Sequence, residues 1–245
     1  YDLVLVSAPA GFGKTTLLGE WAREERPQAH TCWLSLDEGD SDPVRFFEYV
    51  IRALQGFQLH LGEKVLSWLH SPPPPPARSV LVALSNELVD LDENLVLALD
   101  DFQLVTSADV HDAVSLLLDH LPPRLHLLIA TRADPPLPLA RLRGRGQLLE
   151  IGADDLRFTA EEAAELLREL GGARLAAEHV EALAERTEGW AVGLKMAALA
   201  LSQRQDVSRF VGDFAGSQRY IMDYLVEEVL EQQTDDVQDF LLKTS

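Results

Sequence analysis

Short apolar runs alternate with longer amphipathic segments over roughly the first 150 residues of this 245-residue chain. Five runs are apolar enough to be buried strands: Leu3 to Val6, Cys32 to Leu36, Leu95 to Leu99, Leu125 to Ala130 and Leu148 to Ile151. Apolar residues recur at helical spacing between several of these runs. Alternating strands and helices are typical of βαβ units, so the pattern predicts an α/β fold with a parallel sheet.

The signals at helix ends support this interpretation. Asp42 is a good N-cap, and Pro43 suits the first helical position. The apolar stripe that follows predicts a helix and consists of Val44, Phe47, Ile51 and Leu54. A further helix is expected over Val110 to Leu121. The prolines at positions 72–76 predict a stiff, exposed connector, with a docking motif for a proline-binding partner as the alternative.

After Ile151 the pattern becomes helical throughout. Thr159 and Glu162 form a capping-box signature, and Gly171-Gly172 ends the helix that follows. Further helices are expected over Ala176 to Arg186, Trp190 to Ser202, Gln218 to Glu231 and Asp235 to Lys243. The boundary between the α/β domain and a helical domain is therefore placed near Asp154.

Composition and charge exclude several functions. The chain has 21 Lys and Arg against 40 Asp and Glu, a net charge of −19, and no basic stripe, so this piece alone is not expected to bind DNA tightly. The single Cys32 rules out an internal disulfide and suggests a reducing, cytoplasmic location. No apolar run approaches the ~18 residues of a membrane span. The chain starts inside a strand pattern, as expected of a piece of a longer protein.

The segment from the first strand to the first helix carries the clearest chemical signal. It reads Leu-Val-Leu-Val-Ser-Ala-Pro-Ala-Gly-Phe-Gly-Lys-Thr-Thr over residues 3–16 and predicts a strand, a phosphate-binding loop and a helix. Gly11 and Gly13 allow positive φ and a close approach of backbone N–H groups to phosphate. Lys14 would reach the β- and γ-phosphates, and the Thr15 hydroxyl would bind Mg²⁺. Ala8 replaces the usual first glycine; the alternative is a chance glycine-rich turn.

The loop residues predicted to contact the nucleotide are Pro9, Ala10, Gly11, Phe12, Gly13, Lys14, Thr15 and Thr16.

Polar residues follow the third and fourth predicted strands. Asp100 and Asp101 end one strand, and carboxyl ends of parallel strands line ligand sites. Asp100 would hold Mg²⁺ directly or through water, and Asp101 would orient or deprotonate an attacking water. Thr131 and Arg132 end the next strand, where Arg132 would sense a γ-phosphate or, alternatively, lie on the surface.

A separate basic cluster occurs in this acidic chain, at Arg141, Arg143 and Arg145. These arginines are expected to pair with nearby carboxylates, or one of them to reach nucleotide.

Taken together, these motifs resemble those of the large ATP-binding LuxR-type transcriptional regulators related to MalT, which are STAND ATPases within the AAA-like group. The resemblance rests on the phosphate loop at 8–17 and on the segments at 33–40, 99–102, 130–132, 142–151, 156–159, 187–191 and 224–230. It implies a P-loop NTPase sheet of about five strands in the order 5-1-4-3-2. It also implies a nucleotide-binding domain at 1–154, a helical domain at 155–217 and the beginning of a winged-helix region at 218–245.

The resemblance implies a signal-transduction switch. Members rest with ADP, become competent with ATP and an inducer, self-associate, activate transcription, and reset by slow ATP hydrolysis. The cofactors would be ATP or ADP with Mg²⁺. Trp190 stands where related proteins place a residue against adenine, although a core tryptophan is an equal alternative. DNA binding and the unknown inducer's site would belong to the intact protein.

Two other classes remain open. A steadily turning-over ATPase, such as a motor or a kinase, would show rapid turnover, whereas a switch would retain ADP after one slow turnover. A scaffold with an inactive nucleotide site is disfavoured by the intact Lys14, Thr15, Asp100 and Asp101.

Overall fold

The computed structural model describes residues 1–24, 29–171, 176–202 and 211. The chain forms two compact units. Unit 1 comprises residues 1–9 and 14–152, and unit 2 comprises residues 10–13 together with the chain from Ala153 onward. Four residues of the expected phosphate loop therefore group with the helical part of the protein.

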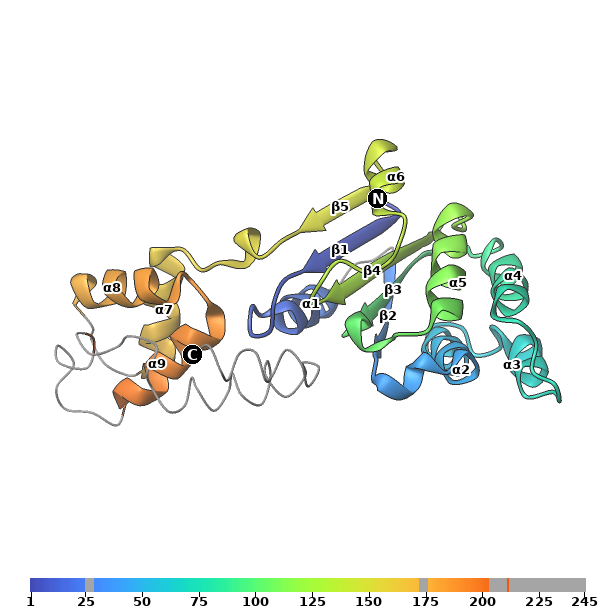
Figure 1. Cartoon of the computed structure of the whole chain (residues 1–245), viewed down its shortest axis with the longest axis horizontal. Coiled ribbons are helices and arrows are strands. Elements are labelled where there is room, and N and C mark those ends of the chain that lie inside the picture. The colour runs from blue at the N-terminus through green and yellow to red at the C-terminus, as the bar shows by residue number, and fades with distance from the viewer. Residues whose placement is uncertain (25–28, 172–175, 203–210, 212–245) are drawn as a thin grey trace, which may run out of the picture. The chain divides into compact units, whose positions relative to one another are not determined.

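Unit 1 is built on a five-stranded, wholly parallel sheet (Figure 1). Its strands are β1 (Leu3–Ser7), β2 (Ala29–Ser35), β3 (Asn94–Asp100), β4 (Leu125–Thr131) and β5 (Leu148–Ile151). The spatial order is β2-β3-β4-β1-β5. This order confirms the expected 5-1-4-3-2 arrangement, with β4 between β1 and β3.

The three central strands of the sheet, β1, β3 and β4, are buried on both faces. Side chains at every second position join one large apolar core, and they are Leu3, Leu5, Leu95, Leu97, Leu99, Leu125, Leu127 and Ile129. Residues between them, including Val6, Ala98 and Leu128, are also buried but lie outside that cluster. Successive strand residues point to opposite faces, so continuous apolar runs are what a sheet covered on both faces requires.

Helices and 3₁₀ turns connect the strands. They are α1 (Lys14–Arg23), η1 (Glu38–Ser41), α2 (Pro43–Gln55), α3 (Glu63–Leu69), α4 (Ala77–Leu88), η2 (Phe102–Leu104), α5 (Ala108–Asp119) and α6 (Leu139–Gly144). Figure 1 shows α2 to α5 gathered on one side of the sheet. Residues from all four of these helices enter the large apolar core.

The predicted start of α2 is confirmed: the Asp42 carboxylate accepts hydrogen bonds from the N–H groups of Val44 and Arg45, at 2.7 and 3.3 Å, and Pro43 is the first helical residue. The proline run lies between α3 and α4 outside regular structure, as a connector should. The helices α3, α4 and α6 were not predicted. Two of them have only seven and six residues, and α4 begins directly after the prolines.

Unit 2 contains η3 (Asp154–Leu156) and the helices α7 (Ala160–Gly171), α8 (Ala177–Thr187) and α9 (Ala191–Ser202). The capping box is present, because Thr159 N–H donates to Glu162 at 2.8 Å and Glu162 N–H donates to the Thr159 hydroxyl at 3.3 Å. The core of the unit consists of Ala163, Leu167, Val180, Leu183, Leu194, Ala197, Ala198, Leu201 and Val211.

The predicted helices at 218–231 and 235–243, and with them the expected winged-helix region, lie outside the described residues. Within the described ranges, no helix has both the length and the apolar character that crossing a membrane requires.

Candidate functional site

The loop between β1 and α1 has the backbone conformation that the sequence predicts. Gly11 and Gly13 adopt φ values of 77° and 79°. A Cβ at Gly13 would meet no atom within 4 Å, so positive φ, rather than lack of space, is the reason for glycine there. Helix α1 begins at Lys14, directly after the loop. Its first N–H groups lack partners in the helix and carry the positive end of the helix dipole, which favours an anion.

Lys14 is buried at the start of α1, with 7% of its surface exposed. Its ammonium group donates hydrogen bonds to the carbonyl oxygens of Ala8 at 2.7 Å and Pro9 at 3.0 Å. Burial, reinforced by the positive charge of Arg132, lowers the pKa of Lys14, whereas Asp101 and Asp100 act to raise it. The lysine therefore lies within electrostatic reach of all three charged residues that end β3 and β4.

Asp100 is the last residue of β3 and is 2% exposed. Its pKa is raised, chiefly because burial penalises the carboxylate, although a hydrogen bond with the Thr15 side chain opposes the shift. The Asp101 N–H also donates to the Asp100 carboxylate at 3.0 Å. The two residues predicted to hold Mg²⁺, Thr15 and Asp100, therefore lie close enough for their side chains to interact.

Gln103 connects two predicted site residues. Asp101 adopts left-handed φ and ψ of 57° and 38°, and its carboxylate accepts a hydrogen bond from the Gln103 side-chain amide at 2.8 Å. The Arg132 N–H donates to the side-chain oxygen of the same Gln103 at 3.0 Å. One side chain therefore holds the end of β3 against the end of β4.

Sequence reasoning missed Gln103. The only signal available was a polar residue two positions after Asp101.

Two arginines of the basic cluster pair with carboxylates, which was the first of the two expectations for this cluster. Arg143 pairs with Glu150 through its Nε at 2.8 Å, and Arg141 pairs with Asp119. The guanidinium of Arg143 lowers the pKa of Glu150. Two of the three arginines are thus matched with carboxylates of unit 1.

Trp190 and Phe12 have contacts within unit 2. The Trp190 indole N–H donates to the Ala10 carbonyl at 3.0 Å, and Val192 N–H donates to the Gly11 carbonyl at 3.1 Å. The Arg157 guanidinium lies 5.9 Å from the centre of the Phe12 ring. Contact of Trp190 with adenine stays a prediction.

The preceding Gly189, at φ 70°, has no room for a side chain, because a Cβ would lie 2.6 Å from the Phe158 carbonyl oxygen.

The residues of unit 1 fit a magnesium ion. The Thr15 hydroxyl and the buried Asp100 carboxylate lie near each other, and both are oxygen ligands of the kind that Mg²⁺ takes in phosphate sites, where water completes the shell. In the described part of the chain, no cluster of three or more His, Cys, Asp or Glu is arranged to hold a metal by itself. Mg²⁺ sites commonly use one or two carboxylates together with substrate phosphates.

The structure therefore brings Lys14, Thr15, Asp100, Asp101 and Arg132 to the carboxyl ends of three neighbouring strands, β1, β4 and β3. This edge carries two cationic side chains and two carboxylates beside a helix N-terminus. This edge can attract a polyphosphate and its metal ion. The Asp101 carboxylate, which Gln103 holds, would then lie beside them. The roles assigned to the individual residues stay predictions.

Sequence comparison finds relatives over the full length of the chain. It is 37% identical over 254 residues to the HTH-type transcriptional regulator MalT of Yersinia enterocolitica, and 33% identical over 244 residues to the serine/threonine-protein kinase PknK of Mycobacterium tuberculosis. These alignments cover 100% and 99% of the chain but only 27% and 22% of the relatives. The expected resemblance to MalT-like regulators is confirmed. No family model matches the chain.

Solved structures agree on the fold. Cdc6p of Pyrobaculum aerophilum aligns with a TM-score of 0.50 and 15% identity over 82% of the chain and 56% of that protein. Aeropyrum pernix Orc1, solved in complex with DNA, aligns with a TM-score of 0.50 and 14% identity over 98% of the chain and 65% of that protein. At such identities the likeness concerns the fold alone. The chain thus has the fold of the P-loop NTPases, and over its whole length it is similar to a segment of the MalT transcriptional regulators and of PknK.

Proposed function

We propose that this chain is the ATP- and ADP-binding switch module of a MalT-type transcriptional activator, reset by slow ATP hydrolysis. The observation that carries the proposal is the electrostatic grouping of Lys14 with Asp100, Asp101 and Arg132 at one edge of the sheet. Homology to a segment of MalT supplies the biological setting. PknK, which is named as a serine/threonine-protein kinase, contains a similar segment. This is expected if the segment is a regulatory module that different proteins use.

In this proposal Lys14 and the N–H groups of the phosphate loop bind the β- and γ-phosphates. Lys14 would exchange its hydrogen bonds with the Ala8 and Pro9 carbonyls for phosphate oxygens. Each exchange replaces a neutral acceptor with a charged one, and charge-assisted hydrogen bonds are stronger. Burial strengthens the contact further, because the local dielectric constant is lower than that of water.

Thr15 and Asp100 would hold Mg²⁺, which neutralises phosphate charge when it is bound. Asp101 would orient or deprotonate the attacking water, and Arg132 would respond to the γ-phosphate. Gln103 keeps the last two residues in register through its two hydrogen bonds, at 2.8 and 3.0 Å. The γ-phosphate is the chemical difference between ATP and ADP, so its contacts can bias a conformational equilibrium.

The partners follow from charge and homology. With a net charge of −19 the chain itself repels nucleic acid, so the proposed DNA contact belongs to another part of the intact regulator. An inducer and self-association would likewise act through the intact protein.

Nucleotide binding and single-turnover hydrolysis, measured on wild type, Lys14→Ala and Asp101→Ala, test the proposal. Lys14→Ala should weaken Mg-ATP binding by at least about tenfold, since it removes a charge-assisted contact worth roughly 1.5–3 kcal/mol. Asp101→Ala should bind nucleotide normally and lose hydrolysis. Wild-type affinity in Lys14→Ala would refute the site. Steady turnover at or above about 1 s⁻¹ would favour an ordinary ATPase over a switch.

A further inference from the structure

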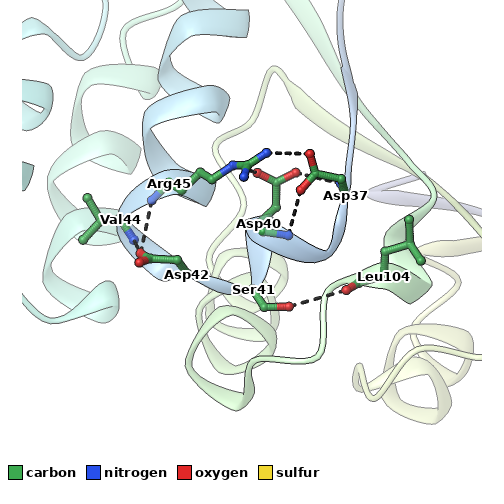
Figure 2. A network of polar contacts seen from close by, with 8 residues as sticks. Asp37, Asp40, Ser41, Asp42, Val44, Arg45 and Leu104 are labelled. Carbon is green, nitrogen blue, oxygen red and sulfur yellow. Dashed lines mark hydrogen bonds and ion pairs between the residues drawn. The ribbon is translucent and has the colours of Figure 1, made fainter. Parts of the chain in front are cut away.

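An ion-paired loop lies beside the turn that carries Asp101. Residues 37–42, here called the clamp loop, connect β2 to α2 and contain η1 (Figure 2). Asp37 begins the loop: its carboxylate accepts from Gly39 N–H at 2.7 Å, and its own N–H donates to Asp40 at 2.8 Å. These reciprocal bonds fix the loop backbone.

Arg45 holds the clamp loop from the first turn of α2. Its guanidinium donates to Asp37 at 2.5 Å and lies 3.1 Å from the Asp40 carboxylate. Asp40 is only 1% exposed, and a buried carboxylate is tolerated only when it is paired. A Cβ on Gly39 would lie 2.0 Å from an Arg45 nitrogen, so glycine leaves room for this arginine.

Ser41 connects the clamp loop to the segment after β3. Its hydroxyl oxygen accepts a hydrogen bond from Thr106 N–H at 2.9 Å. The hydroxyl lies 3.4 Å from the Leu104 carbonyl oxygen, to which it donates, and 3.3 Å from the Thr106 hydroxyl. The contact with Leu104 is drawn in Figure 2. A second connection lies nearby, where Leu36 N–H donates to the Asp100 carbonyl at 3.0 Å.

The segment after β3 that Ser41 contacts is short, and its other end carries residues of the candidate site. The turn η2 begins directly after Asp101 and contains Gln103, which holds Asp101 and Arg132. Leu104 N–H donates to the Asp101 carbonyl at 3.0 Å, and Val105 N–H donates to Phe102 at 3.1 Å. Only a single 3₁₀ turn therefore separates the atoms that bind Ser41 from the side chains at the candidate site.

We propose that Ser41, held by the Asp37–Arg45–Asp40 cluster, is a positioning residue for ATP hydrolysis, because it fixes the turn through which Gln103 places Asp101. This inference rests on the proposed function. Ser41 contacts neither of the magnesium candidates nor Lys14, so it acts on the hydrolytic step and not on nucleotide affinity. Small displacements of a catalytic group can cost large factors in rate, which makes such remote support effective.

The hydroxyl of Ser41 can be tested without breaking the buried ion pair. Ser41→Ala removes only the hydrogen bonds between the clamp loop and the segment after β3, whereas removing Arg45 would leave the buried Asp40 carboxylate without its cationic partner. Ser41→Thr keeps a hydroxyl and serves as the conservative rescue. Arg52→Ala, on the same helix, removes the exposed contact with Glu48 at 3.5 Å and is the matched control.

The measurements are the single-turnover rate with Mg-ATP, the Kd for Mg-ADP, the melting temperature and hydrogen exchange at the Thr106 amide. In Ser41→Ala the single-turnover rate should fall about fivefold to tenfold, because the turn that positions Asp101 loses the hydrogen bonds of the Ser41 hydroxyl, and Kd should be unchanged. The amide hydrogen of Thr106 should exchange with solvent faster than it does in wild type. Ser41→Thr and Arg52→Ala should retain the wild-type rate.

The outcomes separate the two proposals. A wild-type chain that binds no nucleotide refutes the proposed function. Normal binding with equal hydrolysis in wild type and Ser41→Ala refutes the positioning role alone. A parallel loss of rate, affinity and melting temperature in Ser41→Ala, or a failure of Ser41→Thr to restore the rate, also overturns it, because either result indicates general damage to the fold.

Discussion

Asp100 and Lys14 are charged groups in largely buried positions, 2% and 7% exposed. Burial disfavours the charged form of each, and accordingly the pKa of Asp100 is raised and that of Lys14 is lowered. The Thr15 hydroxyl and Lys14 only partly offset the shift at Asp100, and Asp101 and Asp100 only partly offset the shift at Lys14. Such a site favours a ligand that carries both kinds of charge. A phosphate chain with a divalent cation does so, because its oxygens can pair with Lys14 and its cation with Asp100.

Asp100→Asn should stabilise the nucleotide-free protein at neutral pH. The pKa of Asp100 is higher in the folded than in the unfolded chain, so folding stability falls as pH rises through that raised pKa. The cost is fully present once the pH exceeds the raised pKa, because the buried carboxylate is then ionised. Asparagine keeps an oxygen that accepts hydrogen bonds and removes the charge. Melting temperatures recorded between pH 4 and pH 8 measure the effect.

The gain in Asp100→Asn should shrink as pH is lowered, since the wild-type carboxyl then becomes neutral as well. Asp90→Asn, in an exposed turn of unit 1, is the control and should leave the melting temperature unchanged. A lower melting temperature for Asp100→Asn at pH 7 would contradict the argument. So would a gain that is independent of pH.

At the scale of elements, the helix α2 depends on a single residue at its start. The Asp42 carboxylate accepts from two N–H groups that have no partner within the helix. Because α2 also supplies five buried apolar residues to the core, loss of its cap weakens packing as well as the helix.

Asp42→Ala should lower the free energy of unfolding by about 1 kcal/mol, the usual value of an N-cap. Chemical denaturation followed by circular dichroism measures this change. Asp42→Ser retains a capping oxygen and should remain within about 0.5 kcal/mol of wild type. Equal destabilisation by alanine and serine would show that capping is not the cause.

At the scale of the whole molecule, nucleotide binding should appear as added stability. A ligand that binds only the folded state at 100 times its Kd contributes about 2.7 kcal/mol, which for a chain of this size raises the melting temperature by roughly 5 °C or more. Differential scanning fluorimetry with Mg-ADP measures the shift. Lys14→Ala should show a clearly smaller shift at the same ligand concentration, and an unmoved wild-type transition would argue strongly against a functional site.

The sequence predicted the strands well, but it did not predict the shortest helices or the contacts between distant residues. All five strands were predicted from their apolar runs, and the signal is most continuous in β1, β3 and β4, which are buried on both faces. The short helices α3 and α6 escaped, since seven and six residues give too few turns for a clear period. Residues 10–13 could not have been assigned to unit 2 from their pattern, because that grouping depends on contacts distant in sequence, such as Trp190 with Ala10.

The sequence by itself determined the order of the five strands, the positive φ of Gly11 and Gly13, and the types of side chain that follow β1, β3 and β4. These features depend on local conformation and on alternation of apolar residues. Only the tertiary structure decided that Gln103 joins Asp101 to Arg132 and that Ser41 reaches Thr106, 65 residues away. A hydrogen bond between side chains is fixed by direction and distance in space, and a sequence pattern contains neither.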